Sequence, residues 1–285
     1  MTRPGSCPVQ SGAKLPFDPV LKTLGPNTTA PSSVLHENCI YCAGEDRREL
    51  LQAFAETGPA HACKRVKEYL RRITKADAPV DGEFGPDWYY RSYEFWRFPD
   101  FCLMLSGVGT GCLEPLLYEV LRANVVRKIV LVGTAGAMPE GKAELGRAYN
   151  VNPASAAGTG IDAIIGERQL PSRWQTELGE TASTVSTDFY YGFAPGVVRG
   201  EASVHQRFED HRQRKTDLVD MEVAQFYFFC ENFGSDHLQY VAVKAAANAV
   251  GRGEQQPLNT GIALRSTLRA AFLLLNIPML TKSSE

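Results

Sequence analysis

The sequence lacks the features that define several large classes of protein. No apolar run approaches the roughly 18 residues needed to span a bilayer, and the segment Met1–Gly5 does not open an apolar secretion signal. The 30 Lys and Arg nearly balance the 32 Asp and Glu, which leaves a net charge of −2 and no polybasic block. These absences predict a cytoplasmic protein that is neither a general nucleic-acid binder nor a membrane-surface binder.

Cysteine and histidine lack the spacings that build disulfide frameworks or bind metals. Seven cysteines are an odd number, which favours reduced thiols. Cys39 and Cys42 have CxxC spacing without a second pair, and we interpret both as small core residues. The five histidines form no metal-ligand pattern, and His205 and His211 lie in a charged segment typical of a solvated face. We therefore expect no bound metal.

What is present indicates one α/β domain behind an N-terminal arm. Residues 1–36 are rich in Pro, Ser, Thr and Gly and form an arm without its own core, whereas residues 37–280 form the main domain. Phe101–Leu105 and Lys128–Val132 are continuous apolar runs, as in strands buried on both faces. A helical pattern at Leu113–Leu121 separates them, which predicts adjacent parallel strands with a crossover helix. We expect a single domain with a central mixed, twisted sheet flanked by helices.

Other segments complete this expected fold. Leu50, Leu51 and Phe54 recur at helical spacing, and the aromatic stretch Trp88–Phe98 is typical of strands or of a surface against a partner. The remaining expected strands are Cys39–Ala43, Ser183–Ser186 and Gln239–Lys244, the remaining helices are Lys64–Ile73, Met221–Phe233 and Leu264–Leu275, and Ala76–Pro86 is an expected loop.

Two glycine-rich segments follow the central strands and are interpreted as turns. Ser106–Gly111 follows the first strand, and Gly133–Gly136 follows the second. Ligands of α/β sheets bind at such carboxyl ends, where glycines let backbone amides approach an anion. The pattern is not a dinucleotide fingerprint, because the third glycine falls one residue early and no carboxylate ends the next strand.

Asp220-Met221-Glu222 opens an apolar helix and offers two acidic groups. Capping of the helix explains Asp220. Glu222 is the candidate for binding, since one carboxylate accepts two hydroxyl hydrogen bonds, as a ribose diol requires.

In order along the chain, these segments resemble motifs of the nucleoside phosphorylase and nucleosidase superfamily, which includes purine nucleoside phosphorylase, uridine phosphorylase and methylthioadenosine nucleosidase. The resemblance runs from about Ile40 to Val250. It rests on five ordered motifs: Ala43-Gly44-Glu45-Asp46-Arg47-Arg48, Ser106-Gly107-Val108-Gly109, Val132-Gly133-Thr134-Ala135-Gly136, Ser186-Thr187-Asp188-Phe189-Tyr190 and Val219-Asp220-Met221-Glu222.

The resemblance implies a role for each matching residue. Met221 and Glu222 match the ribose clamp, and Thr134 matches the Ser or Thr that contacts phosphate or the attacking water. The other matches are Gly44 and Arg48 in the phosphate loop, Gly109 beside the anion, and Tyr190 or Phe189 near base and sugar. Arg91 matches an arginine that reaches the site of the partner subunit across a dimer interface. The expected assembly is accordingly a dimer-based homo-oligomer.

Three departures from the family pattern bear on the reaction. Leu131 stands where phosphorylases carry an arginine two residues before the Gly-Ser/Thr turn, although Arg48 keeps one phosphate arginine. Asn248 stands where purine-specific members carry a proton-donating aspartate, and an amide is no general acid. Tyr190-Tyr191-Gly192 lacks the Gln and Arg that read uracil, so an aromatic pocket suits a purine better.

The resemblance implies cleavage of the N-glycosidic bond of a nucleoside, with a purine preferred and with no metal or organic cofactor required. Phosphorolysis, with inorganic phosphate as co-substrate, stands slightly ahead of hydrolysis of a nucleoside or nucleotide. A third alternative is a catalytically weakened family member that binds nucleosides, which Leu131 and Asn248 favour. The expected catalytic residues are Glu222, Asn248 and Thr134.

Overall fold

The computed structural model describes residues 31–73, 84–90, 93–174, 176, 179–188, 202–250 and 257–279. Its described strands form one nine-stranded sheet: β1 (Asn38–Ala43), β2 (Trp88–Tyr90), β3 (Tyr93–Arg97), β4 (Cys102–Ser106), β5 (Lys128–Ala137), β6 (Ala148–Ala156), β7 (Glu180–Ser186), β8 (Leu218–Asp220) and β9 (Gln239–Ala249). The described helices are η1 (Pro31–Ser33), α2 (Arg47–Thr57), α3 (Ala60–Ile73), α4 (Thr110–Arg122), α5 (Asp162–Ile165), α6 (Ala202–Gln213), α7 (Val223–Phe233) and α8 (Pro257–Leu274).

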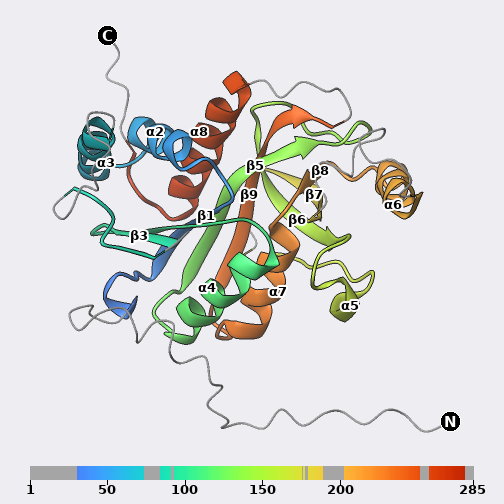
Figure 1. Cartoon of the computed structure of the whole chain (residues 1–285), viewed down its shortest axis with the longest axis horizontal. Helices are drawn as coiled ribbons and strands as arrows, with labels where there is room; N and C mark the ends of the chain where they lie inside the picture. The colour runs from blue at the N-terminus through green and yellow to red at the C-terminus, as the bar shows by residue number, and fades with distance from the viewer. Residues whose placement is uncertain are drawn as a thin grey trace, which may run out of the picture.

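The sheet closes on itself over half of its length. Its strand order is β2-β3-β4-β1-β5-β8-β7-β6-β9, and β9 pairs again with β5. The strands β5, β8, β7, β6 and β9 therefore form a closed ring, and β1, β4, β3 and β2 extend from it as an open wing (Figure 1). Parallel and antiparallel pairs both occur, so the expected mixed α/β sheet is confirmed, with a barrel-like half that the sequence did not predict.

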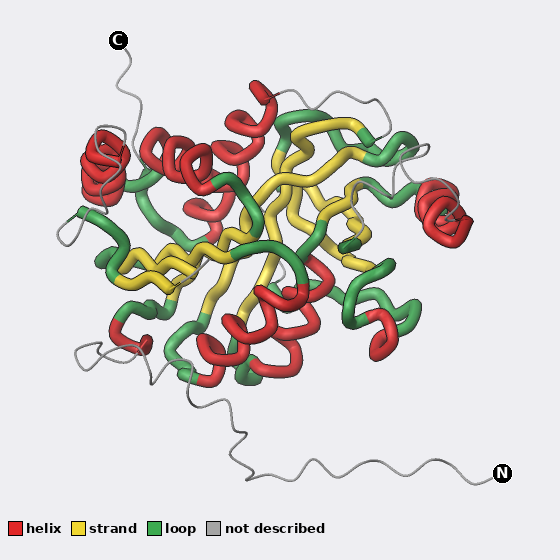
Figure 2. The backbone as a smooth tube through the Cα atoms, in the orientation of Figure 1, coloured by secondary structure: helices red, strands yellow, loops and turns green. Residues whose placement is uncertain are grey.

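Helices cover the two faces of the central strands, and successive residues alternate between them. Ile129 and Leu131 of β5 lie in the core beneath α4 and α7, whereas Val130 and Val132 lie in the core beneath α2 and α8. Figure 2 shows these helices on either side of the strands. Strands covered on both faces need apolar residues throughout, which is why they are continuous apolar runs. Leu131 is fully buried.

Two expectations about the central strands are wrong. The strands at 101–105 and 128–132 are not neighbours, because β1 lies between β4 and β5 and pairs in parallel with both. Gly133–Gly136 is not a turn: β5 continues through it to Ala137, paired with β9 and then with β8. Glycine is needed at position 133 because the side chains of Glu45 and Lys244 lie close to this part of the strand backbone.

Most of the other expected elements are confirmed, with small changes at their ends. Cys39 and Cys42 are buried in β1, as expected, and β9 continues five residues beyond Lys244. His211 departs from the expected solvated face: α6 is polar, but this imidazole is only 7% exposed and lies 3.1 Å from the Thr216 hydroxyl. The expected loop Ala76–Pro86 falls mostly outside the described residues. Of the described helices, none has the length and apolar character to cross a membrane.

Tyr227 of α7 supplies hydrogen bonds where the β6–β9 ladder ends. Val151 and Ala242 are the last paired residues of that ladder. The buried Tyr227 hydroxyl donates to the Val151 carbonyl at 2.5 Å and accepts from the Ala242 amide at 3.0 Å. We expect Tyr227→Phe to lower the free energy of unfolding by about 1–3 kcal/mol, because two buried backbone groups lose their partner.

Urea denaturation measures this loss. Tyr118→Phe on α4 makes the same chemical change at a hydroxyl for which the described residues provide no hydrogen bond, and we expect it to change the free energy by less than about 0.5 kcal/mol. Equal effects of the two substitutions would contradict a special role for Tyr227.

Candidate functional site

The loops that follow β1 and β4 meet at the edge of the barrel. The Gly44 amide donates to the Ser106 carbonyl at 3.0 Å, because the two parallel strands end side by side. Gly44 has φ +74°, and a Cβ on it would lie 2.7 Å from Cβ of Val108 and 3.2 Å from Oε1 of Glu222. Only glycine fits this conformation and this space, so the β1 loop lies directly against Glu222.

Glu222 stands at the start of α7 on a rigid support. The Asp220 carboxylate accepts from the backbone amides of Glu222 and Val223 at 2.9 and 3.0 Å. It also accepts from the hydroxyls of Ser186 and Thr184, both at 2.7 Å. Asp220 is thus a structural cap that joins β7, β8 and α7, as the capping interpretation predicts. Its bonds fix the backbone from which the Glu222 side chain extends.

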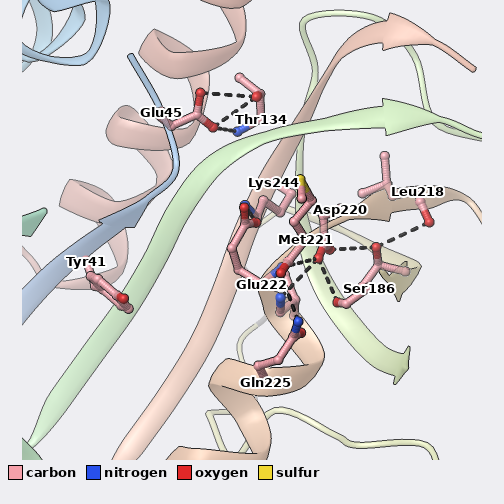
Figure 3. A network of polar contacts seen from close by, with 12 residues as sticks. Tyr41, Glu45, Thr134, Ser186, Leu218, Asp220, Met221, Glu222, Gln225 and Lys244 are labelled. Carbon is pink, nitrogen blue, oxygen red and sulfur yellow. Dashed lines mark hydrogen bonds and ion pairs between the residues drawn. The ribbon is translucent and has the colours of Figure 1, made fainter. Parts of the chain in front are cut away.

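A buried ion pair holds the Glu222 carboxylate. Nζ of Lys244, on β9, donates to Oε2 of Glu222 at 2.7 Å, and the Lys244 side chain is fully buried (Figure 3). Lys244 lies two residues from both Ala242 and Ala246, which place this side of β9 in the core beneath α7. The barrel thereby brings Glu222 and Lys244 together from separate elements.

A second carboxylate lies on the residue expected to contact phosphate or water. Glu45 accepts hydrogen bonds from both the backbone amide and the hydroxyl of Thr134, the latter at 2.9 Å (Figure 3). A Cβ on Gly133 would lie 2.8 Å from Oε1 of Glu45 and 2.9 Å from Nζ of Lys244. The glycine within β5 therefore makes room for a carboxylate and an ammonium group beside the strand backbone.

The charges of this site interact strongly. Burial raises the pKa of Glu222 to about 7; the Lys244 ammonium lowers that pKa, whereas the carboxylates of Asp220 and Glu45 raise it further. Although burial lowers it, the pKa of Lys244 is raised above its ordinary value by Glu222, Asp220 and Glu45. Lys244 is therefore charged at neutral pH, and Glu222 exchanges its proton near neutrality.

The other predicted site residues are less closely gathered. Arg48 is exposed at the start of α2, and Gly109, with φ +85°, begins α4 near Asp188. Met221 presents its carbonyl to the Gln225 side chain at 2.9 Å. Asn248 is half-buried near the end of β9, in register with Gly136. Arg91, Phe189 and Tyr190 lie outside the described residues.

Two residues of the cluster were missed by the sequence analysis as functional groups. Glu45 was noted only as part of the first of the five motifs, and Lys244 only as the end of an expected strand. The signal for Lys244 was present: it is a single charged residue in the otherwise apolar run Tyr240–Ala247. Such a charge inside a buried strand indicates a partner, because an unpaired buried ammonium is costly.

Elsewhere, a cavity of about 340 Å³ lies between α5, the end of β6 and α6. Arg207, Asp162 and His211 are among its lining residues, and Arg207 pairs with Asp162 at 3.1 Å. None of the four residues Glu45, Thr134, Glu222 and Lys244 lines it. Across the described residues, no group of three or more His, Cys, Asp or Glu is placed to hold a metal ion.

Comparison with known proteins gives a match in structure alone. The sequence matches no family model and no curated protein. Purine nucleoside phosphorylase from Toxoplasma gondii, with immucillin-H, is 14% identical over 86% of this chain and 94% of that chain, at a TM-score of 0.53. The 5′-methylthioadenosine/S-adenosylhomocysteine nucleosidase of Helicobacter pylori is 12% identical over 85% of this chain and 99% of that chain, at a TM-score of 0.54. The corresponding enzyme of Neisseria meningitidis is 14% identical over 84% of this chain and 100% of that chain, at a TM-score of 0.51.

The chain has the nucleoside phosphorylase/nucleosidase fold. This confirms the fold that the five ordered motifs imply. At such identities the likeness concerns the fold, and the chemistry has to be argued from the residues of the site.

The raised pKa of Glu222 predicts a dependence of stability on pH. The folded protein binds the Glu222 proton more tightly than the unfolded chain, whose ordinary pKa is 4.5. The contribution of this group to stability is therefore full below pH 4.5 and is lost as pH rises through about 7. Relative to wild type, Glu222→Gln should gain up to about 3 kcal/mol between pH 4 and pH 8, because the amide does not titrate.

Denaturant unfolding of both proteins across this pH range provides the measurement. Glu114→Gln, at an exposed position of α4, is the matched control and should differ from wild type by the same amount at every pH. A constant difference for Glu222→Gln as well would show that Glu222 titrates in its ordinary range.

Proposed function

We propose that this protein hydrolyses the N-glycosidic bond of a ribonucleoside or ribonucleotide, with a purine base preferred. The observation that carries this proposal is the position of Glu45, whose carboxylate accepts from the amide and hydroxyl of Thr134. These donors belong to the residue that the family resemblance assigns to phosphate or to the attacking water. In this chain the protein's own carboxylate already binds them.

The charges nearby also disfavour phosphate. A phosphate dianion at Thr134 would face Glu45 and Glu222, and the nearby Lys244 ammonium is already paired with Glu222 at 2.7 Å. Leu131 is fully buried in the core and provides no guanidinium group, and Arg48 is exposed on α2. Repulsion between a phosphate dianion and these carboxylates costs free energy, whereas a neutral water molecule is not repelled. Hydrolysis therefore moves ahead of phosphorolysis, which the sequence alone slightly favoured.

The proposed mechanism gives each carboxylate one task. Glu222 accepts hydrogen bonds from the ribose hydroxyls and fixes the sugar. Water, held near Glu45, attacks C1′ as the C1′–N bond breaks; its proton passes to Glu45, and the bond electrons leave with the base. The negative charge of Glu45, Asp220 and Glu222 exceeds the positive charge of Lys244. This excess of negative charge stabilises the cationic sugar of the transition state. Asn248 is placed by the resemblance at the base, where its amide hydrogen-bonds but does not protonate.

Product analysis tests the reaction. The protein is incubated with a panel of nucleosides and nucleotides, with and without inorganic phosphate, and the sugar product is identified. We expect free base and ribose at a rate that does not depend on phosphate. Ribose-1-phosphate as product would overturn hydrolysis in favour of phosphorolysis. Binding without turnover would instead support the nucleoside-binding alternative.

Two substitutions test the assigned roles. Glu45→Gln should lower kcat by roughly 10²–10⁴-fold with little change in KM, because it removes the base and keeps the shape of the side chain. Glu222→Ala should lower kcat/KM by about 100-fold or more, because the ribose loses its acceptor. Glu114→Gln serves as the control with unchanged kinetics, and near-normal turnover of either site variant would remove that residue from the mechanism.

The expected dimer-based assembly and the 5′ substituent of the substrate are part of this proposal as well. Arg91, the residue proposed to be lent across the interface, lies outside the described residues. Sedimentation of the full chain tests the assembly, and the nucleotide arm of the substrate panel tests the 5′ substituent.

A further inference from the structure

Lys244 is the most deeply buried charge of the described structure. Its side chain has no exposed surface, and Ala242 and Ala246, on the same face of β9, lie in the apolar core. Transfer of an ammonium group from water into such an environment is strongly unfavourable unless it is paired. An apolar residue would serve the core equally well, so the retained charge points to a role in the site.

Lys244 connects the two ends of the proposed reaction. Its Nζ donates to Glu222, which binds the sugar, at 2.7 Å. It also lies beside Glu45, since Oε1 of Glu45 and Nζ of Lys244 would both come within 3 Å of a Cβ on Gly133, at 2.8 and 2.9 Å. Figure 3 shows Lys244 between two places: Thr134, which donates hydrogen bonds to Glu45, and the start of α7, where Glu222 lies.

The two oxygens of Glu222 have different surroundings. Oε2 is the acceptor for Lys244, whereas Oε1 lies toward Gly44, where a Cβ would be 3.2 Å away. Gly44 is on the loop after β1, and its lack of a side chain lets the backbone of this loop lie against Oε1. The ion pair thus occupies one oxygen and directs the other toward the loop that borders the site.

We propose that Lys244 is a positioning residue, which favours the charged form of Glu222 and directs its free oxygen to the sugar, so that the site selects substrates with a ribose 2′-hydroxyl. This inference rests on the proposed function, since it concerns how the same site recognises its sugar. A charged Glu222 accepts from both hydroxyls of the diol, and a 2-deoxy sugar leaves one acceptor of a buried carboxylate unpaired. Loss of the Lys244 charge leaves Glu222 protonated at neutral pH, and a protonated carboxyl group has lost part of its acceptor capacity.

The groups that act on Glu222 come from each element around it. Lys244 on β9 favours its charged form, and Asp220 on β8 and Glu45 after β1 oppose it. Tyr41 and Cys42 of β1 also lie within electrostatic range, and burial raises the pKa of each, so both are neutral near pH 7. Among these, Lys244 alone is a cation, and its removal shifts the balance in one direction.

The first experiment does not require turnover. The free energy of unfolding is measured across pH for the protein with Glu222 and for the Glu222→Gln variant, and the difference between the two gives the midpoint pH at which Glu222 titrates. The same pair is then measured in the Lys244→Met background and in the Lys244→Arg background. We expect a midpoint near 7 for wild type, a midpoint higher by about one unit or more with Lys244→Met, and a return toward the wild-type value with Lys244→Arg. Lys142→Met, an exposed lysine, is the matched control and should leave the midpoint unchanged.

The second experiment measures sugar selection. Calorimetry compares the binding of adenosine and 2′-deoxyadenosine to these variants in the Glu45→Gln background, where the proposed base is absent. We expect at least about a tenfold preference for adenosine with Lys244 or Lys244→Arg, which corresponds to one lost hydrogen bond to a charged group, and a ratio near 1 with Lys244→Met.

The outcomes separate the two proposals. An unchanged midpoint, or a preference for adenosine that survives Lys244→Met, would overturn the role of Lys244. Absence of nucleoside binding to every protein would overturn the proposed function, and the midpoint would then decide the link between Lys244 and Glu222. If Lys244→Met does not fold, the double variant Lys244→Met/Glu222→Gln decides: recovered folding supports the pairing, and failure to recover contradicts it.

Discussion

The pairing of one buried ammonium group with several carboxylates is the constraint around which the barrel is built. Lys244 is fully buried, so the fold is stable only if acceptors reach it, and β8 and the β1 loop deliver Glu222 and Glu45 to the same place. Removal of one partner from such a cluster costs far more than the pair itself contributes, because the remaining charge is left buried. Closure of the sheet between β5 and β9 brings these segments within reach.

The glycines of the site follow from this constraint. Gly133 lies in the strand because any side chain would displace both the Glu45 carboxylate and the Lys244 ammonium group. Gly44 adopts a left-handed conformation and lies against Glu222 for the same reason of space. The glycine-rich segment of β5 is therefore a strand whose backbone is approached by charged groups, which differs from the turn that its composition suggests.

The sequence predicts the elements that local patterns define, and it does not predict the contacts between distant segments. Apolar periodicity identified most strands and helices, because strands such as β4 and β5 bury both faces. The position of β1 between them depends on pairing between distant segments, and no local pattern encodes it. Glu222 was predicted as a site residue from its motif and its helix start. The contacts of Glu45 and Lys244 depend on barrel closure, so their residue types were visible and their partners were not.

The identity of the group bound to Thr134 links the fold to the choice of reaction. An amide and a hydroxyl that point to one place bind an oxyanion, and the donors do not distinguish a carboxylate from a phosphate. A glutamate one residue after Gly44 reaches those donors from within the chain, and the Lys244 ammonium group lies nearby. One side chain on the β1 loop thus occupies the donors of Thr134, and under the proposed hydrolysis it supplies a base where a phosphorolytic site would receive a dianion.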